Sequence, residues 1–119
     1  MQEQGDIAFK GNKLQPAVEL YGECIEHATV GEAALRLAAT NNRALALLKL
    51  NRPADAYTDC ETVLAAQPDN VKAVFRKAEA CRLLGRTDDA RALLRRCLEL
   101  QPTNSAAQAV LDTLDEGAR

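Results

Sequence analysis

The chain has 119 residues, of which 47% are hydrophobic and 27% are charged, and its formal net charge is −2. This length suits one domain, or a short array of small repeated units, and it excludes a second hydrophobic core. Only 3% of the residues are aromatic, so the core must be built from Leu, Ala, Val and Ile, which favours helices over sheets.

Helices are predicted along the whole chain, near residues 2–11, 14–28, 32–50, 54–66, 71–84, 88–100 and 104–116. Prolines mark the beginnings or ends of these helices, because a proline in a helix interior removes a hydrogen bond. They are Pro16, Pro53, Pro68 and Pro102. No run of 18 apolar residues is present, so we expect no membrane-spanning segment.

Turn residues separate the predicted helices. Asn12, Asn51 and Gly85 are expected where a first helix stops, because Asn and Gly tolerate the left-handed backbone conformation. The candidates for the N-caps of the following helices are Asp69 or Asn70, and Thr103 or Asn104. The pattern therefore predicts a series of helix–turn–helix units.

An internal repeat of 34 residues is the strongest signal in the chain. When the sequence is shifted by 34 residues, Leu50-Asn51-Arg52 falls on Leu84-Gly85-Arg86, and Gln67-Pro68 falls on Gln101-Pro102. Small residues lie three to five positions into each second helix, where they let two helices approach closely. These residues are Ala17, Ala56 and Ala90.

The pattern Gly-x-x-x-Phe-Lys followed by Ala-x-x-x-Tyr resembles the tetratricopeptide repeat. It is formed by Gly5, Phe9, Lys10, Ala17 and Tyr21. Together with the 34-residue offset, the resemblance implies an all-α, right-handed superhelical solenoid that occupies residues 1–119 as one domain. Its three repeats are expected near residues 1–31, 36–69 and 70–103, and a capping helix is expected near residues 104–116.

Charge is distributed unevenly along the sequence. Residues 71–97 carry eight Lys and Arg against three acidic residues, whereas the first seventy residues carry six basic and ten acidic residues. The overall balance of 15 basic to 17 acidic residues argues against general nucleic-acid binding. One basic segment on an otherwise acidic chain instead indicates an anionic partner.

Lys72 and Arg76 are four residues apart and share one face of their predicted helix, next to the Asn41-Asn42 pair of the preceding repeat. Two cations and an amide that converge in this way suit a carboxylate. The alternative is that both cations are ordinary solvated surface charges. Phe75, beside Arg76, is either a hydrophobic ligand contact or part of the core.

The same residues look like the two-carboxylate clamp of co-chaperone tetratricopeptide domains of the immunophilin and myosin-folding types. Those domains grip the C-termini of heat-shock chaperones that end in Glu-Glu-Val-Asp. The resemblance implies that Asn42, Lys72 and Arg76 bind the peptide carboxylates. The first repeat departs from the family, because Gln2 stands where the family has Lys and Asp6 where it has Asn.

Two hypotheses about function follow. In the first, the chain is an adaptor that binds an acidic C-terminal peptide, most of all a heat-shock chaperone tail, in the concave groove. In the second, it is a structural assembly module that docks a protein without needing a free carboxylate. Gln2, Asp6 and Glu79 favour the second hypothesis, because they make the groove less cationic. As possible peptide contacts we include Gln2, Asp6, Asn41, Phe75 and Glu79.

No enzymatic activity, cofactor or metal is expected. Cys24, Cys60, Cys81 and Cys97 form no C-x-x-C pair, and the single His27 lies on no ligand spacing with them. The polar, acidic N-terminus does not resemble a signal peptide. Free thiols in a chain of this kind are typical of a reducing, cytoplasmic compartment.

The last predicted helix leads to a test of stability. Three repeats are near the minimum for a solenoid, and a terminal helix shields the apolar face of the last one. Deletion from Thr103 onward is therefore expected to give an aggregating or unfolded product in size-exclusion chromatography. A soluble truncated chain with a cooperative melting transition would show that this helix is not a cap.

Overall fold

The computed structural model describes residues 5–6, 13–27 and 32–117, all but the side chain of His27. Its helices are α2 (Leu14–His27), α3 (Ala33–Lys49), α4 (Pro53–Ala66), α5 (Val71–Leu83), α6 (Thr87–Leu100) and α7 (Ser105–Gly117). The described residues contain no strand, which confirms the all-α prediction. Each of these helices begins and ends within one residue of its predicted bounds. Of the predicted helix 2–11, only Gly5 and Asp6 are described, and both are helical.

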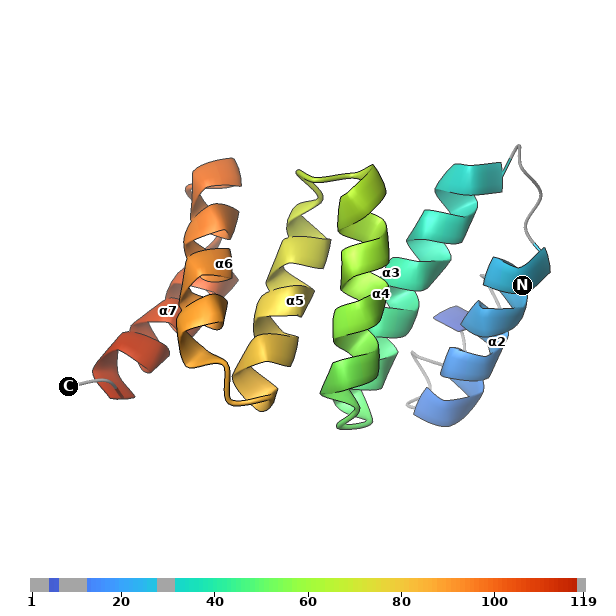
Figure 1. Ribbon diagram of the computed structural model, residues 1–119, viewed down its shortest axis with the longest axis horizontal. Helices are drawn as coiled ribbons and strands as arrows, with labels where there is room; N and C mark the ends of the chain where they lie inside the picture. The colour runs from blue at the N-terminus through green and yellow to red at the C-terminus, as the bar shows by residue number, and fades with distance from the viewer. Residues whose placement is uncertain (1–4, 7–12, 28–31, 118–119) are drawn as a thin grey trace.

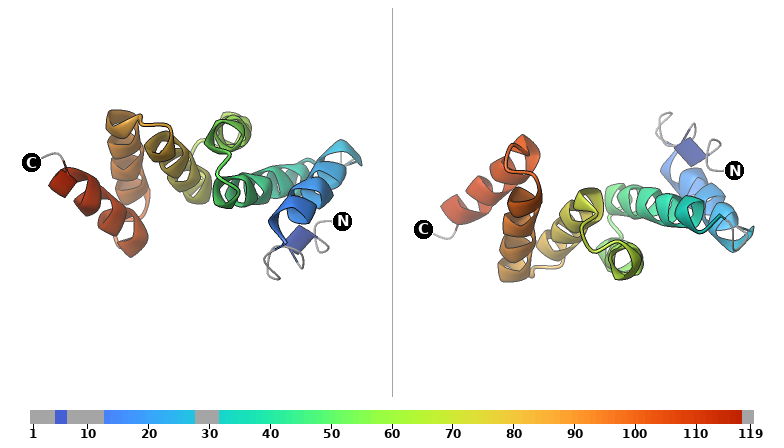
Figure 2. Two further views of the ribbon diagram at one scale, coloured as in Figure 1. Left: turned by 90° about the horizontal axis from the view of Figure 1, so that it is seen from below. Right: turned by 90° about the horizontal axis from the view of Figure 1, so that it is seen from above.

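The helices form a single row in which each packs against the next, and α3 also contacts α5 (Figure 1). Seen from below or above, the helices do not lie in one plane, and α4 stands to one side of α3 and α5 (Figure 2). The row measures 47 × 27 × 23 Å. This elongated layout is the expected solenoid, and it gives the molecule two distinct long faces.

The two turns within helix pairs have the same geometry. Asn51 and Gly85 have φ angles of 59° and 79°, so the predicted left-handed positions are confirmed for both, while Asn12 lies outside the described residues. The next amide in each turn reaches back five residues, from Arg52 to Leu47 and from Arg86 to Cys81. Of the described helices, α3 and α5 therefore each end in a Schellman motif, at positions 34 residues apart.

The two turns between helix pairs also match one another. Asn70 caps α5, because its side-chain oxygen accepts a hydrogen bond of 3.1 Å from the Ala73 amide. Asn104 accepts the equivalent bond of 3.0 Å from Ala107 at the start of α7. Of the cap candidates that the sequence left open, the asparagine serves in both turns, and it fixes where α5 and α7 begin.

The core consists of small residues at the helix crossings and larger ones around them. Ala17, Ala56 and Ala90 are fully buried, which confirms their packing role. Three buried clusters follow one another along the row, and the largest joins α5, α6 and α7 through Val74, Leu94 and residues of the last helix. The last helix thus supplies part of the core, since Ala107 and Leu111 are buried.

Arg91 ties α6 to α7. Its side chain is only 17% exposed, and its Nε lies 3.2 Å from Oδ1 of Asp115. Its Nη2 also donates a hydrogen bond of 2.9 Å to the carbonyl oxygen of Leu114, one of the carbonyls left unpaired at the end of a helix. Arg91 is therefore not a solvated surface charge, because α7 folds over it.

Removal of this side chain should loosen the last helix. We expect Arg91→Ala to lower the free energy of unfolding by about 1–3 kcal/mol, because a charged donor leaves the carbonyl of Leu114. Arg95, an exposed arginine of the same helix, is the matched control, and Arg95→Ala should change stability by less than about 0.5 kcal/mol. Urea denaturation followed by circular dichroism measures both variants. Equal effects of the two substitutions would contradict this role of Arg91.

Candidate functional site

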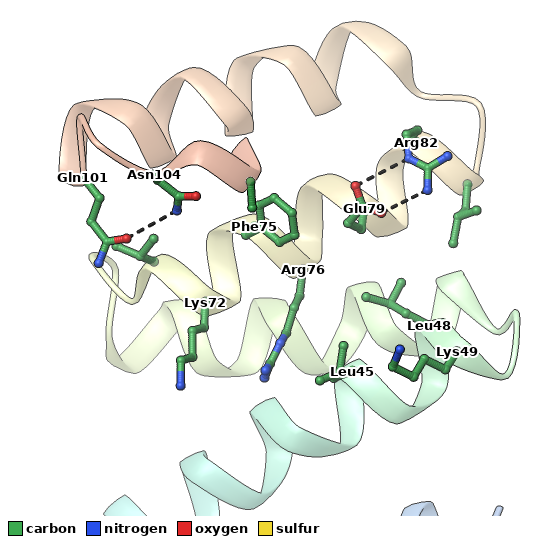
Figure 3. A pocket seen from close by; sticks show the side chains of 13 residues that line it. Leu45, Leu48, Lys49, Lys72, Phe75, Arg76, Glu79, Arg82, Gln101 and Asn104 are labelled. Atoms are coloured by element: carbon green, nitrogen blue, oxygen red, sulfur yellow. Dashed lines mark hydrogen bonds and ion pairs between the residues drawn. The ribbon is translucent and has the colours of Figure 1, made fainter. Parts of the chain in front are cut away.

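A groove of about 600 Å³ lies along the face formed by α3, α5 and the start of α7 (Figure 3). The apolar part of its lining comes from Leu45, Leu48, Val71, Phe75, Leu83 and Ala106. Its polar part comes from Lys49, Lys72, Arg76, Glu79, Arg82, Gln101 and Asn104. Sequence reasoning singled out Lys72, Phe75, Arg76 and Glu79, and the structure brings these four together here.

Lys72 and Arg76 project from α5 in the same direction (Figure 3). The Asn70 cap starts the helix immediately before them, and their four-residue spacing then places both on one face. Lys72 is exposed, whereas Arg76 is half-buried. These two candidate cations of the groove therefore differ in their exposure to water.

Arg76 is held by neutral groups. Its Nη1 donates hydrogen bonds to the backbone oxygen of Asn41, at 2.7 Å, and to the side-chain oxygen of the same residue, at 2.9 Å. No acidic group of the described residues forms an ion pair with it. Burial lowers the pKa of the Arg76 guanidinium below its ordinary value. A half-buried cation without a negative partner favours an incoming anion.

Arg43 shows the opposite arrangement. Its Nε and Nη2 donate to the two carboxylate oxygens of Asp59, at 2.8 Å and 2.6 Å, and Asp59 is buried. The hydrogen bond to Asp59 raises the pKa of Arg43 above its ordinary value. The charge of Arg43 is thus used to join α3 to α4, whereas that of Arg76 remains available.

Amide side chains surround a second, more polar hollow of about 310 Å³, which adjoins the larger groove at Lys72. It is lined by Ala34, Leu37, Ala38, Asn41, Asn42, Gln67, Asn70 and Lys72. The candidate residues Asn41 and Asn42 lie here and not in the larger groove, and Lys72 lines both. A ligand held at Lys72 can therefore reach the amides on one side and the apolar surface on the other.

From the sequence, Glu79 was expected to make the groove less cationic. It lines the groove, but its carboxylate forms an ion pair of 3.0 Å with Arg82, one turn further along α5. Dashed lines mark this contact in Figure 3. The negative charge of Glu79 is therefore balanced within the helix and does not cancel that of Arg76.

Asp6 accepts a hydrogen bond from the hydroxyl of Tyr21, which is 2% exposed. Burial first, and then this hydrogen bond, raise the pKa of the Tyr21 hydroxyl. A side chain at Gly5 would lie 2.5 Å from the Tyr21 ring, so glycine is required there. The acidic residue at this end of the face thus has a structural partner. The other first-repeat candidate, Gln2, lies outside the described residues.

Sequence reasoning missed the apolar lining at Leu45 and Leu48 and the amides at Gln67 and Asn70. The 34-residue offset already showed Gln67 and Asn70 as repeated residues, and an amide in both copies was a usable signal. Leu45 and Leu48 gave no signal, because their exposure depends on how α3 is rotated against α5.

The described residues contain no group of three or more His, Cys, Asp or Glu side chains that could hold a metal ion. Among the described helices, none is long and apolar enough to cross a membrane. Cys24, Cys60, Cys81 and Cys97 are all free and buried.

Comparison with known proteins agrees with the repeat fold described above. The family model described as "Tetratricopeptide repeat" matches residues 47–114. The chain is 34% identical over 122 residues to the peptidyl-prolyl cis-trans isomerase FKBP4 of Bos taurus, covering 93% of this chain and 26% of that protein. It is 36% identical over 96 residues to sperm-associated antigen 1 of Mus musculus, covering 80% of this chain. The chain therefore spans 11–28% of the length of the curated relatives it matches.

Similar solved structures include peptide complexes. The myosin chaperone UNC-45 from C. elegans, in complex with a Hsp90 peptide, has a TM-score of 0.92 and 32% identity over 98% of this chain and 13% of that one. The first TPR of Spaghetti (RPAP3), bound to the HSP90 peptide SRMEEVD, has a TM-score of 0.89 and 26% identity, covering 98% and 89%. The second TPR domain of human RPAP3, with the HSP70 peptide SGPTIEEVD, has a TM-score of 0.81 and 27% identity, covering 95% and 90%.

The buried thiols should be unreactive while the chain is folded. Burial raises the pKa of Cys60 from 9.0 to about 12, so its reactive thiolate is scarce at pH 8. Ellman's reagent should label the cysteines slowly in the native chain and completely in denaturant. Because unfolding lowers this pKa, the contribution of Cys60 to stability is full below pH 9 and is lost as the pH rises toward 12. Fast native labelling would contradict this and indicate a reactive cysteine.

Proposed function

Because the chain belongs to the tetratricopeptide repeat family, we propose that it is an adaptor that binds the acidic C-terminal peptide of a heat-shock chaperone. One observation carries this proposal: Arg76 is a half-buried cation in a groove, and no acid of the described residues pairs with it. Lys72 lies one turn away on the same groove. A peptide that ends in several carboxylates is the partner that such a pair of cations suits.

The apolar part of the groove adds a second requirement. The peptides bound by the two RPAP3 domains end in Glu-Glu-Val-Asp, and an aliphatic residue, Met or Ile, comes directly before these four residues. The surface of Leu45, Leu48 and Phe75 adjoins Lys72 and Arg76. The aliphatic side chain that precedes the carboxylates in an extended peptide would be removed from water there.

In this proposal, Arg76 and Lys72 pair with peptide carboxylates and Asn42 donates its amide hydrogens to the peptide. Asp6 weakens the grip on the terminal carboxylate, because like charges repel at the first-repeat end. A short, partly solvated charged peptide with few buried anchors binds in the micromolar range, and binding weakens as salt increases.

We assign the chain a binding role and no catalysis. The relatives named as isomerases match it over at most 28% of their length, so their activity is not transferred to it. We further propose a reducing compartment such as the cytoplasm, because all four cysteines are free thiols.

Isothermal titration with the peptide SRMEEVD tests the proposal. We expect micromolar binding, and a loss of at least about tenfold in affinity for Arg76→Ala and for Lys72→Ala, because each removes one cation from the groove. Amidation of the peptide C-terminus should also weaken binding. Arg95→Ala, which removes an exposed cation of α6, is the matched control and should bind as the unmodified chain does.

Lack of binding at millimolar peptide would contradict the proposal. Binding that is unaffected by amidation would favour the assembly module, for which Asp6 is the supporting observation. Equal losses in Arg76→Ala and Arg95→Ala would show that only net charge matters and that the groove is not the site.

A further inference from the structure

We infer that Asn41 positions Arg76 in the groove and, because it is neutral, leaves the charge of Arg76 free for a ligand carboxylate. The inference rests on the proposed function and deepens it, since it names the residue that keeps one of the two proposed carboxylate-binding cations available. Asn41 acts through Arg76 and is therefore a positioning residue.

The geometry of the two hydrogen bonds supports this role. Both bonds from Arg76 to Asn41 start at Nη1, at 2.7 Å and 2.9 Å. A guanidinium has five N–H donors, and within the described part of the chain the Nε and Nη2 of Arg76 form no hydrogen bond. The Nε and Nη2 atoms form one edge of the guanidinium, and Arg43 uses the same edge to bind both carboxylate oxygens of Asp59. In Arg76 the Nε and Nη2 donors of this edge thus remain available for a carboxylate.

The neutrality of Asn41 matters as much as its position. A cation that loses water needs acceptors in exchange. A carboxylate would supply them but would also cancel the charge, as Asp59 does for Arg43. Two oxygens of one asparagine supply acceptors without a charge. The pKa shifts reflect this difference. The hydrogen bond to Asp59 raises the pKa of Arg43, whereas burial lowers the pKa of Arg76.

Asn41 is itself held in one orientation. It is 6% exposed, and its Nδ2 donates to the side-chain oxygen of Asn70 at 3.4 Å. Asn70 is fixed in turn, because it caps α5 at Ala73 and donates to Gln67 at 2.8 Å. With its nitrogen directed at Asn70, the side-chain oxygen of Asn41 is directed at Arg76. The repeat turn that begins α5 therefore also sets the position of the cation.

The substitution Asn41→Asp separates this role from a merely structural one. It keeps the shape of the side chain but gives Arg76 an internal acid. We expect affinity for SRMEEVD to fall at least about tenfold, while the melting temperature falls less than in Asn41→Ala, because the new ion pair with Arg76 offsets the hydrogen bond to Asn70 that is lost. A residue with only a packing role would lose stability and binding together. Asn51→Asp makes the same chemical change at an exposed turn outside the groove lining, and should leave the affinity unchanged.

A double-mutant cycle shows whether Asn41 acts through Arg76. Asn41→Ala should weaken peptide binding in the unmodified chain, but in an Arg76→Ala background it should change affinity by less than about twofold. Peptide titrations to millimolar concentration followed by NMR measure the weak variants. An equal effect of Asn41→Ala in both backgrounds would overturn the inference, because Asn41 would then contact the ligand independently.

Two further outcomes distinguish this inference from the proposed function. If the unmodified chain binds no acidic peptide, the proposed function fails. The positioning of Arg76 is then tested by melting temperature. Asn41→Asp should lower the melting temperature more in the Arg76→Ala background than in the unmodified chain. If the peptide binds but Asn41→Asp binds it equally well, the proposed function stands and the role of Asn41 is overturned.

Discussion

A guanidinium group that leaves water must find acceptors, and Arg76 finds them in the neutral oxygens of Asn41. The groove depends on this contact, because a carboxylate in the same place would neutralise Arg76 and so remove one of the two cations proposed to bind an acidic ligand. The chain contains both solutions in neighbouring helices. Arg43 is paired with Asp59 and joins two helices, whereas Arg76 is held without an acid and remains able to bind one.

The repeat architecture makes this arrangement possible. The turn before α5 and the turn before α7 use the same asparagine cap, Asn70 or Asn104. In the first of these turns the cap also orients Asn41 of α3, so one local motif starts α5 and sets the position of a cation on that same helix. The last helix closes the row through Arg91 and completes the apolar lining of the groove through Ala106. Folding and recognition therefore use the same residues.

Much of the fold was predictable, because its determinants are local. Asn51 and Gly85 fix the turns through their backbone conformation, and the 34-residue spacing fixes the order of the helices. The candidate cations Lys72 and Arg76 follow from helical spacing as well. The contact between Arg76 and Asn41, 35 residues apart, does not, because it depends on the distance between two helices. For the same reason the sequence indicated Asn41 only as a possible peptide contact, and it did not indicate the leucines of the groove.

The central claim is that the open edge of Arg76 receives a peptide carboxylate. The most direct test follows the Nε–H signal of Arg76, assigned by its loss in Arg76→Ala, while unlabelled SRMEEVD is added to the nitrogen-labelled chain. The account predicts that this signal shifts and saturates together with the backbone amides of α5, and that the Nε–H signal of Arg43 stays in place. A bound peptide that moves the backbone signals but leaves Arg76 Nε–H unchanged would contradict it.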